Sequence, residues 1–110
     1  DVYQYLSEQF KYVSISKLKS ILPGIIDELN TIYHFNEDQR VGLFMHMACL
    51  VERLLDGKQS VPNIEKQKIL SVFHDEYQSL SKIFKPLEKA FHIIIDDNEM
   101  TTILMIIKRI

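Results

Sequence analysis

The amino-acid sequence predicts an all-α fold, a compact bundle of about five helices built from pseudo-repeated antiparallel helix pairs. Three observations support this prediction. Only three of the 110 residues are glycine and three are proline, whereas turn-rich β folds use more of both. Apolar residues recur at the three- and four-residue spacing of helices. Hydrophobic residues make up 46% of the chain, enough to bury the core of a single domain.

Two helices are expected before the centre of the chain. The first covers roughly Val2–Tyr12. Ser14 or Ser16 can cap a second helix that runs to about Tyr33, because serine oxygens accept hydrogen bonds from the free amides of a first turn. The Pro23–Gly24 pair interrupts the apolar pattern of this second helix, so we expect it to kink or divide the helix.

A central helix is expected between Asn36 and Gly57. Asn36 and Gln39 have the spacing of a capping box at its start. Gly57 is a natural stop, because glycine readily adopts the left-handed conformation that ends helices. The loop Lys58–Asn63 follows, and Pro62 helps to hold it out of helical geometry.

The last part of the chain predicts a short helix, a longer one and a final one. The short helix is expected over Ile64–Phe73 and the longer one over Glu76–Phe91, with Pro86 bending the longer helix or starting a new segment. The final helix opens at Asp97 or Asn98 and continues to the end of the sequence.

Two segments of the chain resemble each other, which is the basis for the pseudo-repeat. Residues 29–36 and 87–93 each read as a helix end with an aromatic–histidine pair, and each leads through a short acidic turn into a hydrophobic helix. When the acidic turns are aligned, His46 stands opposite Ile106. Two structurally related helix pairs would explain this similarity, although a single short similarity also arises by chance.

Composition restricts the compartment and the partners. A lone Cys49 cannot form an internal disulfide, which favours a reducing compartment. The chain begins at Asp1 without a signal peptide and has no apolar run long enough to span a bilayer, so we expect a cytoplasmic piece of a longer protein with no membrane contact. With a net charge of −2 and scattered lysines, direct binding of nucleic acid by this domain is not expected.

The central helix carries a polar seam on an otherwise apolar surface. Plotted at about 100° per residue, Gly42, His46, Cys49, Arg53 and Asp56 share one face. In one interpretation the histidine and the arginine satisfy carbonyls or carboxylates at the border of the core. In the other, the neutral imidazole is a nucleophile that accepts a phosphoryl group, and the arginine supplies a planar cation for the arriving anion. The spacing alone does not choose between them.

Metal binding and catalysis are poorly supported. His46 and Cys49 could offer two zinc ligands, but no second pair at metal spacing completes a tetrahedral set. The same two residues as a base and a thiol nucleophile lack an orienting group and oxyanion donors. We therefore expect no metal, no cofactor and no enzymatic activity.

The stretch Leu43–Lys58, LFMHMACLVERLLDGK, resembles the PTS regulation domain (PRD) of bacterial transcription regulators that are controlled by the sugar phosphotransferase system. It matches the family pattern Leu-x-x-His-x6-Arg-Leu followed by a glycine. Asn63 stands where the family usually has an asparagine after the central helix. Pro86–Phe91 resembles the passage before the last helix, and Asp97–Glu99 resembles the acidic signature that opens it.

The resemblance implies a single regulatory domain over residues 1–110, excised from a larger multidomain regulator of carbohydrate-utilisation genes. Such domains are phosphorylated on histidine by HPr or an enzyme IIB, and they work as homodimers. By motif position the phosphoacceptor is His46, and Arg53, Glu99 and Asn63 are supporting contacts to the phosphate or the seam. Details of the match favour the sigma-54-dependent activators of the levanase-operon type over RNA-binding antiterminators.

Two alternatives remain beside this interpretation. The family often has a second histidine seven residues after the signature glutamate, but Ile106 occupies that position, which leaves one candidate acceptor. A degenerate copy would be an unmodified helical module for dimerisation or interdomain packing. Glu99 also suits the positive end of a helix dipole, so ordinary capping is its other possible role.

Overall fold

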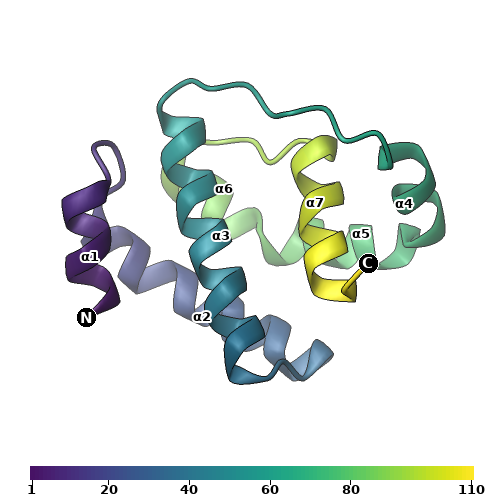
Figure 1. Cartoon of the computed structure of the whole chain (residues 1–110), viewed down its shortest axis with the longest axis horizontal. Coiled ribbons are helices and arrows are strands. Elements are labelled where there is room, and N and C mark those ends of the chain that lie inside the picture. The colour runs from purple at the N-terminus through teal and green to yellow at the C-terminus, as the bar shows by residue number, and fades with distance from the viewer.

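Seven helices and no strands form the chain in the computed structural model, which describes residues 1–110 (Figure 1). The helices are α1 (Val2–Gln9), α2 (Ile15–Tyr33), α3 (Glu37–Leu55), α4 (Lys66–Val72), α5 (His74–Ile83), α6 (Lys85–Phe91) and α7 (Asp97–Lys108). The all-α prediction is confirmed, whereas the expected count of about five helices is too low.

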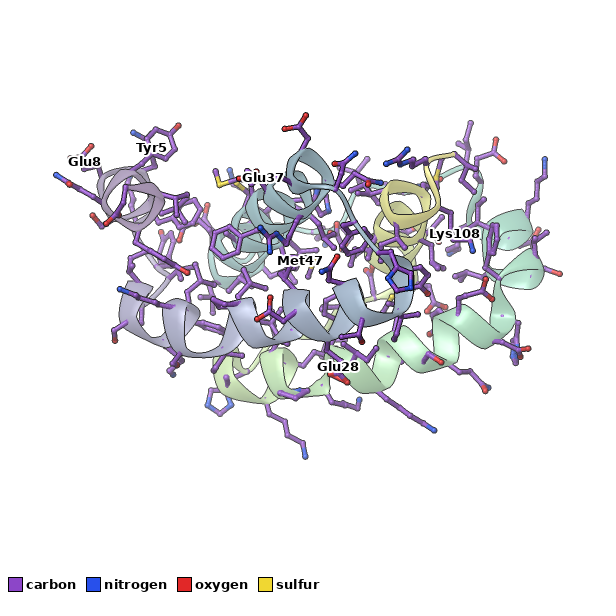
Figure 2. The ribbon with its side chains drawn as sticks, turned by 90° about the horizontal axis from the view of Figure 1, so that it is seen from below. Tyr5, Glu8, Glu28, Glu37, Met47 and Lys108 are labelled. Carbon is purple, nitrogen blue, oxygen red and sulfur yellow. The ribbon has the colours of Figure 1, made fainter.

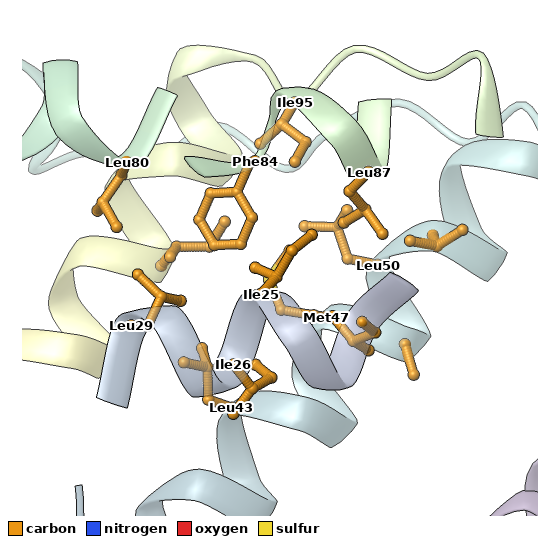
Figure 3. Close-up of a cluster of buried hydrophobic side chains, with 14 of the residues drawn as sticks. Ile25, Ile26, Leu29, Leu43, Met47, Leu50, Leu80, Phe84, Leu87 and Ile95 are labelled. Atoms are coloured by element: carbon orange, nitrogen blue, oxygen red, sulfur yellow. The ribbon is translucent and has the colours of Figure 1, made fainter. Parts of the chain in front are cut away.

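The helices lie in two layers with the core between them (Figures 1 and 2). Helices α1, α3 and α7 make one layer and α2, α5 and α6 make the other, while α4 packs beside α7 at one end. Figure 3 shows Phe84, from the junction of α5 and α6, pointing toward α2 between Leu80 and Ile25. Phe84 is fully buried, as is Met47 of α3. No helix is both long and apolar enough to cross a membrane.

Helix α2 runs without a break through Pro23–Gly24, so of the two outcomes expected there, a kink or a division, the division does not occur. Proline removes one hydrogen bond from a helix interior. The apolar face of α2 offsets this cost, because Leu22, Ile25 and Ile26 next to the proline are all buried against the core. Ser14 caps the helix, its hydroxyl accepting a hydrogen bond from the Lys17 amide at 3.3 Å.

The longer helix expected over Glu76–Phe91 is two helices, which accounts for one of the additional elements. Helix α5 ends at Ile83, and α6 begins at Lys85 with Pro86 in its first turn. Proline is well tolerated there, because the first-turn amides have no partner within the helix. Pro86 thus starts a new segment, and burial of the Phe84 side chain between the two helices fixes the change of direction.

The turns that join α2 to α3 and α6 to α7 have related geometry. His34 and His92 end the first helix of each pair, and both have a left-handed backbone with φ of 54°. Asn36 and Asp96 then cap the second helix of each pair through their side chains. The pseudo-repeat is only approximate, because α2 has 19 residues and α6 has 7.

Candidate functional site

Helices α3 and α7 lie side by side and run antiparallel (Figure 1). At one end, Arg53 of α3 contacts Glu99 in the first turn of α7. At the other end, Gly42 of α3 and Ile106 of α7 line the same small cavity of about 130 Å³. Two members of the predicted seam, Gly42 and Arg53, therefore lie at the boundary between α3 and α7.

Arg53 and Glu99 form a two-point ion pair. The guanidinium Nη1 donates to Oε1 at 3.0 Å, and Nη2 donates to Oε2 at 2.9 Å. The Glu99 side chain is 7% exposed and that of Arg53 is 31% exposed. Parallel charge-assisted bonds of this kind are strong and directional, and the hydrogen bond with Glu99 raises the pKa of Arg53. The cap of α7 is Asp96 and not Glu99, because Asp96 Oδ1 accepts a hydrogen bond from the Glu99 amide at 3.0 Å.

His46 is half-buried, and its ring is not satisfied by a neighbour. The Nε2 atom is enclosed and has no hydrogen-bond partner, which is true of no other buried side-chain nitrogen or oxygen. Burial lowers the pKa of His46, Glu99 raises it and Arg53 lowers it further. The ring is thus held neutral near pH 7. Satisfied polar groups are the rule in buried regions, so the simple structural interpretation fits Arg53 but does not fit His46.

Asn63 lies on a different side of α7 from the ion pair. Its amide nitrogen Nδ2 donates to Thr102 Oγ1 at 3.2 Å, and its backbone N–H donates to Asn98 Oδ1 at 3.1 Å. Its Oδ1 accepts from the Glu65 amide at 2.9 Å. Asn63 therefore fastens the loop between α3 and α4 to α7, and the structure brings it together with α7 but not with Arg53.

The rest of the seam faces solvent. Cys49 is an exposed free thiol, and Asp56 is exposed at the end of α3. Both line an open cleft of about 410 Å³ between α3 and the residues that follow α1. No group of three or more histidine, cysteine, aspartate or glutamate side chains is placed to hold a metal ion.

Glu52, the neighbour of Arg53, is a polar contact that sequence reasoning missed. Its carboxylate accepts hydrogen bonds from the backbone N–H groups of Lys11, Tyr12 and Val13, at 2.8, 3.0 and 3.0 Å. This contact, which we call the Glu52 clasp, ties the α1–α2 loop to α3. No sequence pattern near Glu52 predicts this contact, because the donors are main-chain groups about 40 residues away in the sequence.

Residues 19–110 match a family model described as the PRD domain. No curated protein and no solved structure matches the chain. The matched region contains the seam, the ion pair and Asn63, whereas α1 and the loop held by the Glu52 clasp lie before it.

Proposed function

The chain belongs to the PRD domain family, and on that premise we propose that it accepts a phosphoryl group on His46 and controls a transcription factor. PRD domains are regulatory domains that are typically phosphorylated by components of the sugar phosphotransferase system. The donor is HPr or an enzyme IIB, and the output is expression of carbohydrate-utilisation genes. The parent protein is a cytoplasmic regulator of the levanase-operon, sigma-54-dependent type, and the domain itself is neither an enzyme nor a binder of nucleic acid.

The unpartnered Nε2 of His46 is the observation that carries this proposal. Because burial keeps the imidazole neutral, its ring nitrogen has a lone pair free to attack phosphorus near pH 7. A phosphorus–nitrogen bond forms on His46, and the bond from phosphorus to the histidine or cysteine of the donor breaks. The donor side chain keeps the electron pair of the broken bond and takes up a proton. Arg53, on the same face of α3, supplies positive charge for the product.

The donor can reach the acceptor atom of His46 only if the structure around it moves. Nε2 has no contact with solvent in the resting domain, so transfer to this atom needs a local displacement beside α3. The exposed stretch of the seam around Gly42 and Cys49 is the open side of α3 next to His46. A donor that docks there reaches the ring with the smallest rearrangement.

The test is intact-mass analysis after incubation with phosphoenolpyruvate, enzyme I and HPr, with and without a panel of enzyme IIB proteins. We expect an acid-labile adduct of one phosphoryl group on the wild type and none on His46→Gln. His92→Asn is the matched control, because His92 is exposed and has a left-handed backbone that asparagine tolerates. An adduct that survives His46→Gln, or no adduct with any donor, would contradict the proposal.

A second candidate function is an unmodified module for dimerisation or interdomain packing. The observation in its favour is Ile106, which is 38% exposed and lies at the position of the missing second histidine. An apolar side chain suits a subunit contact better than it suits phosphoryl transfer. The two functions differ in their response to charge, because a phosphoryl group repels its mate across a two-fold interface. Sedimentation analysis of wild type and His46→Asp distinguishes them, and an unchanged association constant favours the unmodified module.

A further inference from the structure

We infer that phosphorylation of His46 draws Arg53 away from Glu99 and thereby loosens the first turn of α7. This exchange rests on the proposed function and adds to it a physical link between the acceptor histidine and a neighbouring helix. It follows from three features of the structure, which are the place of Arg53, the burial of Glu99 and the hydrogen bonds at the start of α7.

Arg53 lies where it can bind either the Glu99 carboxylate or a phosphoryl group on His46. It lies two helical turns from His46, about 10 Å along the axis and at nearly the same angle. Its long side chain is 31% exposed and so keeps room to move. A phosphoryl group carries about two negative charges near pH 7, whereas the Glu99 carboxylate carries one. The planar guanidinium binds both groups through paired hydrogen bonds, so the more highly charged group competes well for it.

Loss of Arg53 leaves Glu99 in an unfavourable position. The Glu99 side chain is 7% exposed, and Arg53 is the partner that its two carboxylate oxygens share. A buried carboxylate that loses its cation is strongly destabilised. The new phosphoryl charge adds repulsion, because Glu99 is already close enough to affect the pKa of His46. Both effects favour movement of Glu99 out toward water, and the first turn of α7 moves with it.

Three backbone amides report directly on that first turn. The Glu99 N–H donates to Asp96 Oδ1 at 3.0 Å, and the Met100 N–H donates to the Asp96 carbonyl at 2.9 Å. The Asn63 N–H donates to Asn98 Oδ1 at 3.1 Å, so the loop between α3 and α4 senses the same movement. Farther along α7, Ile103 and Leu104 are fully buried, so the exchange loosens the start of the helix and leaves the rest in the core.

The start of α3 is a matched control within the same molecule. The Gln39 N–H donates to Asn36 Oδ1 at 2.8 Å, and the Arg40 N–H donates to the Asn36 carbonyl at 3.0 Å. These amides occupy the same positions relative to their cap as the reporters at the start of α7, but no ion pair holds them. Phosphorylation of His46 should leave their hydrogen exchange unchanged.

The experiment uses the full chain with His46 as its single histidine, obtained by His34→Asn, His74→Gln and His92→Asn. Asparagine is chosen at 34 and 92 because both positions have φ of 54°. The protein is phosphorylated with potassium phosphoramidate, a small donor, or with the protein donors above. Amide hydrogen exchange is then measured by NMR together with the side-chain Nε–H signal of Arg53.

We expect exchange at the three reporter amides to rise roughly tenfold, which corresponds to about 1.4 kcal/mol of local opening free energy. The Arg53 Nε–H signal should shift, while those of Arg40 and Arg109 stay in place. In Glu99→Gln, the reporter amides should exchange fast before modification and change little after it. An adduct with unchanged exchange and an unchanged Arg53 signal overturns the inference and leaves the proposed function standing. Failure of every donor to modify His46 overturns both.

Discussion

The turn from α2 to α3 and the turn from α6 to α7 are built alike but use one equivalent residue differently. In the first, the Gln39 side chain returns to the Asn36 backbone N–H at 2.9 Å and completes a capping box. In the second, Glu99 stands at the same distance from its cap, but its side chain turns away and binds Arg53. The same local motif therefore serves one helix as a self-contained cap and the other as a charged link to its neighbour.

This difference follows from the antiparallel packing of α3 and α7. Arg53 stands near the end of α3, level with the start of α7, so the cation is in reach of Glu99. Gln39 lies at the opposite end of the boundary, where it lines a cavity together with Arg109. The carboxylate at the first turn of α7 thus binds a cation across the boundary, whereas the neutral amide at the first turn of α3 binds the backbone of its own turn.

Glu99→Ala should give the largest loss of stability, because it removes the charged link between α3 and α7. It leaves Arg53 without a partner and opens a space in a nearly buried site. We expect a loss of about 2 kcal/mol, below the roughly 3–5 kcal/mol of a fully buried pair because Arg53 keeps contact with water. Urea unfolding followed by circular dichroism measures it. Gln39→Ala is the control and should cost about 0.5 kcal/mol, so equal losses for the two variants would contradict this account.

Asn36→Ala and Asp96→Ala test what the two turns have in common. Each removes the side-chain oxygen that accepts a hydrogen bond from the third amide of the following helix. A lost cap costs about 1 kcal/mol, and we expect both variants to lose this amount in the same unfolding assay. A far larger loss for Asn36→Ala than for Asp96→Ala would mean that the caps are not equivalent.

His34→Gly and His92→Gly test the helix ends that precede the two turns. Both histidines have a left-handed backbone, a conformation that costs non-glycine residues roughly 1 kcal/mol. Glycine removes this strain but gains entropy in the unfolded chain, so the net effect should be a stabilisation of about 0.5 kcal/mol at most. Thermal unfolding midpoints of the two variants should rise slightly and by similar amounts.

The smallest effect concerns His46 and its counterpart Ile106, since only the histidine titrates. The pKa of His46 is lowered in the folded domain, so the unfolded chain binds a proton more readily than the folded one. Stability should therefore fall as the pH drops below about 6.5. His46→Ile, which copies residue 106, should flatten this part of the stability curve. The measurement is urea unfolding between pH 5 and pH 8, and an unchanged slope in the variant would contradict the pKa shift.

Much of the helical layout is local in origin and could be predicted. The capping box at Asn36 and Gln39 is confirmed by both of its hydrogen bonds, and α3 ends two residues before Gly57, whose φ is 75°. The start of α7 at Asp97 was also expected. These boundaries depend on side chains three residues apart in the sequence, so they can be predicted without knowledge of the fold.

The helix breaks that the sequence left open depend on packing. The continuity of α2 through Pro23 and the separation of α5 from α6 at Phe84 are decided by which apolar side chains the core buries. At both positions a proline removes a hydrogen bond from a continuous helix, and only the tertiary structure shows whether buried neighbours offset that loss. The sequence therefore offers two outcomes at each proline and does not choose between them.

At the candidate site, the sequence alone is enough to place His46 and Arg53 on one face of α3, because two helical turns bring a side chain back to nearly the same angle. It also indicated, through the family resemblance, that Glu99 belongs with them. Three features of the site depend on tertiary contacts: Arg53 binds both carboxylate oxygens of Glu99, Nε2 of His46 lacks a partner, and Glu52 holds a distant loop. Helical periodicity is a local property of the chain, whereas ion pairs and burial depend on residues that only folding brings together.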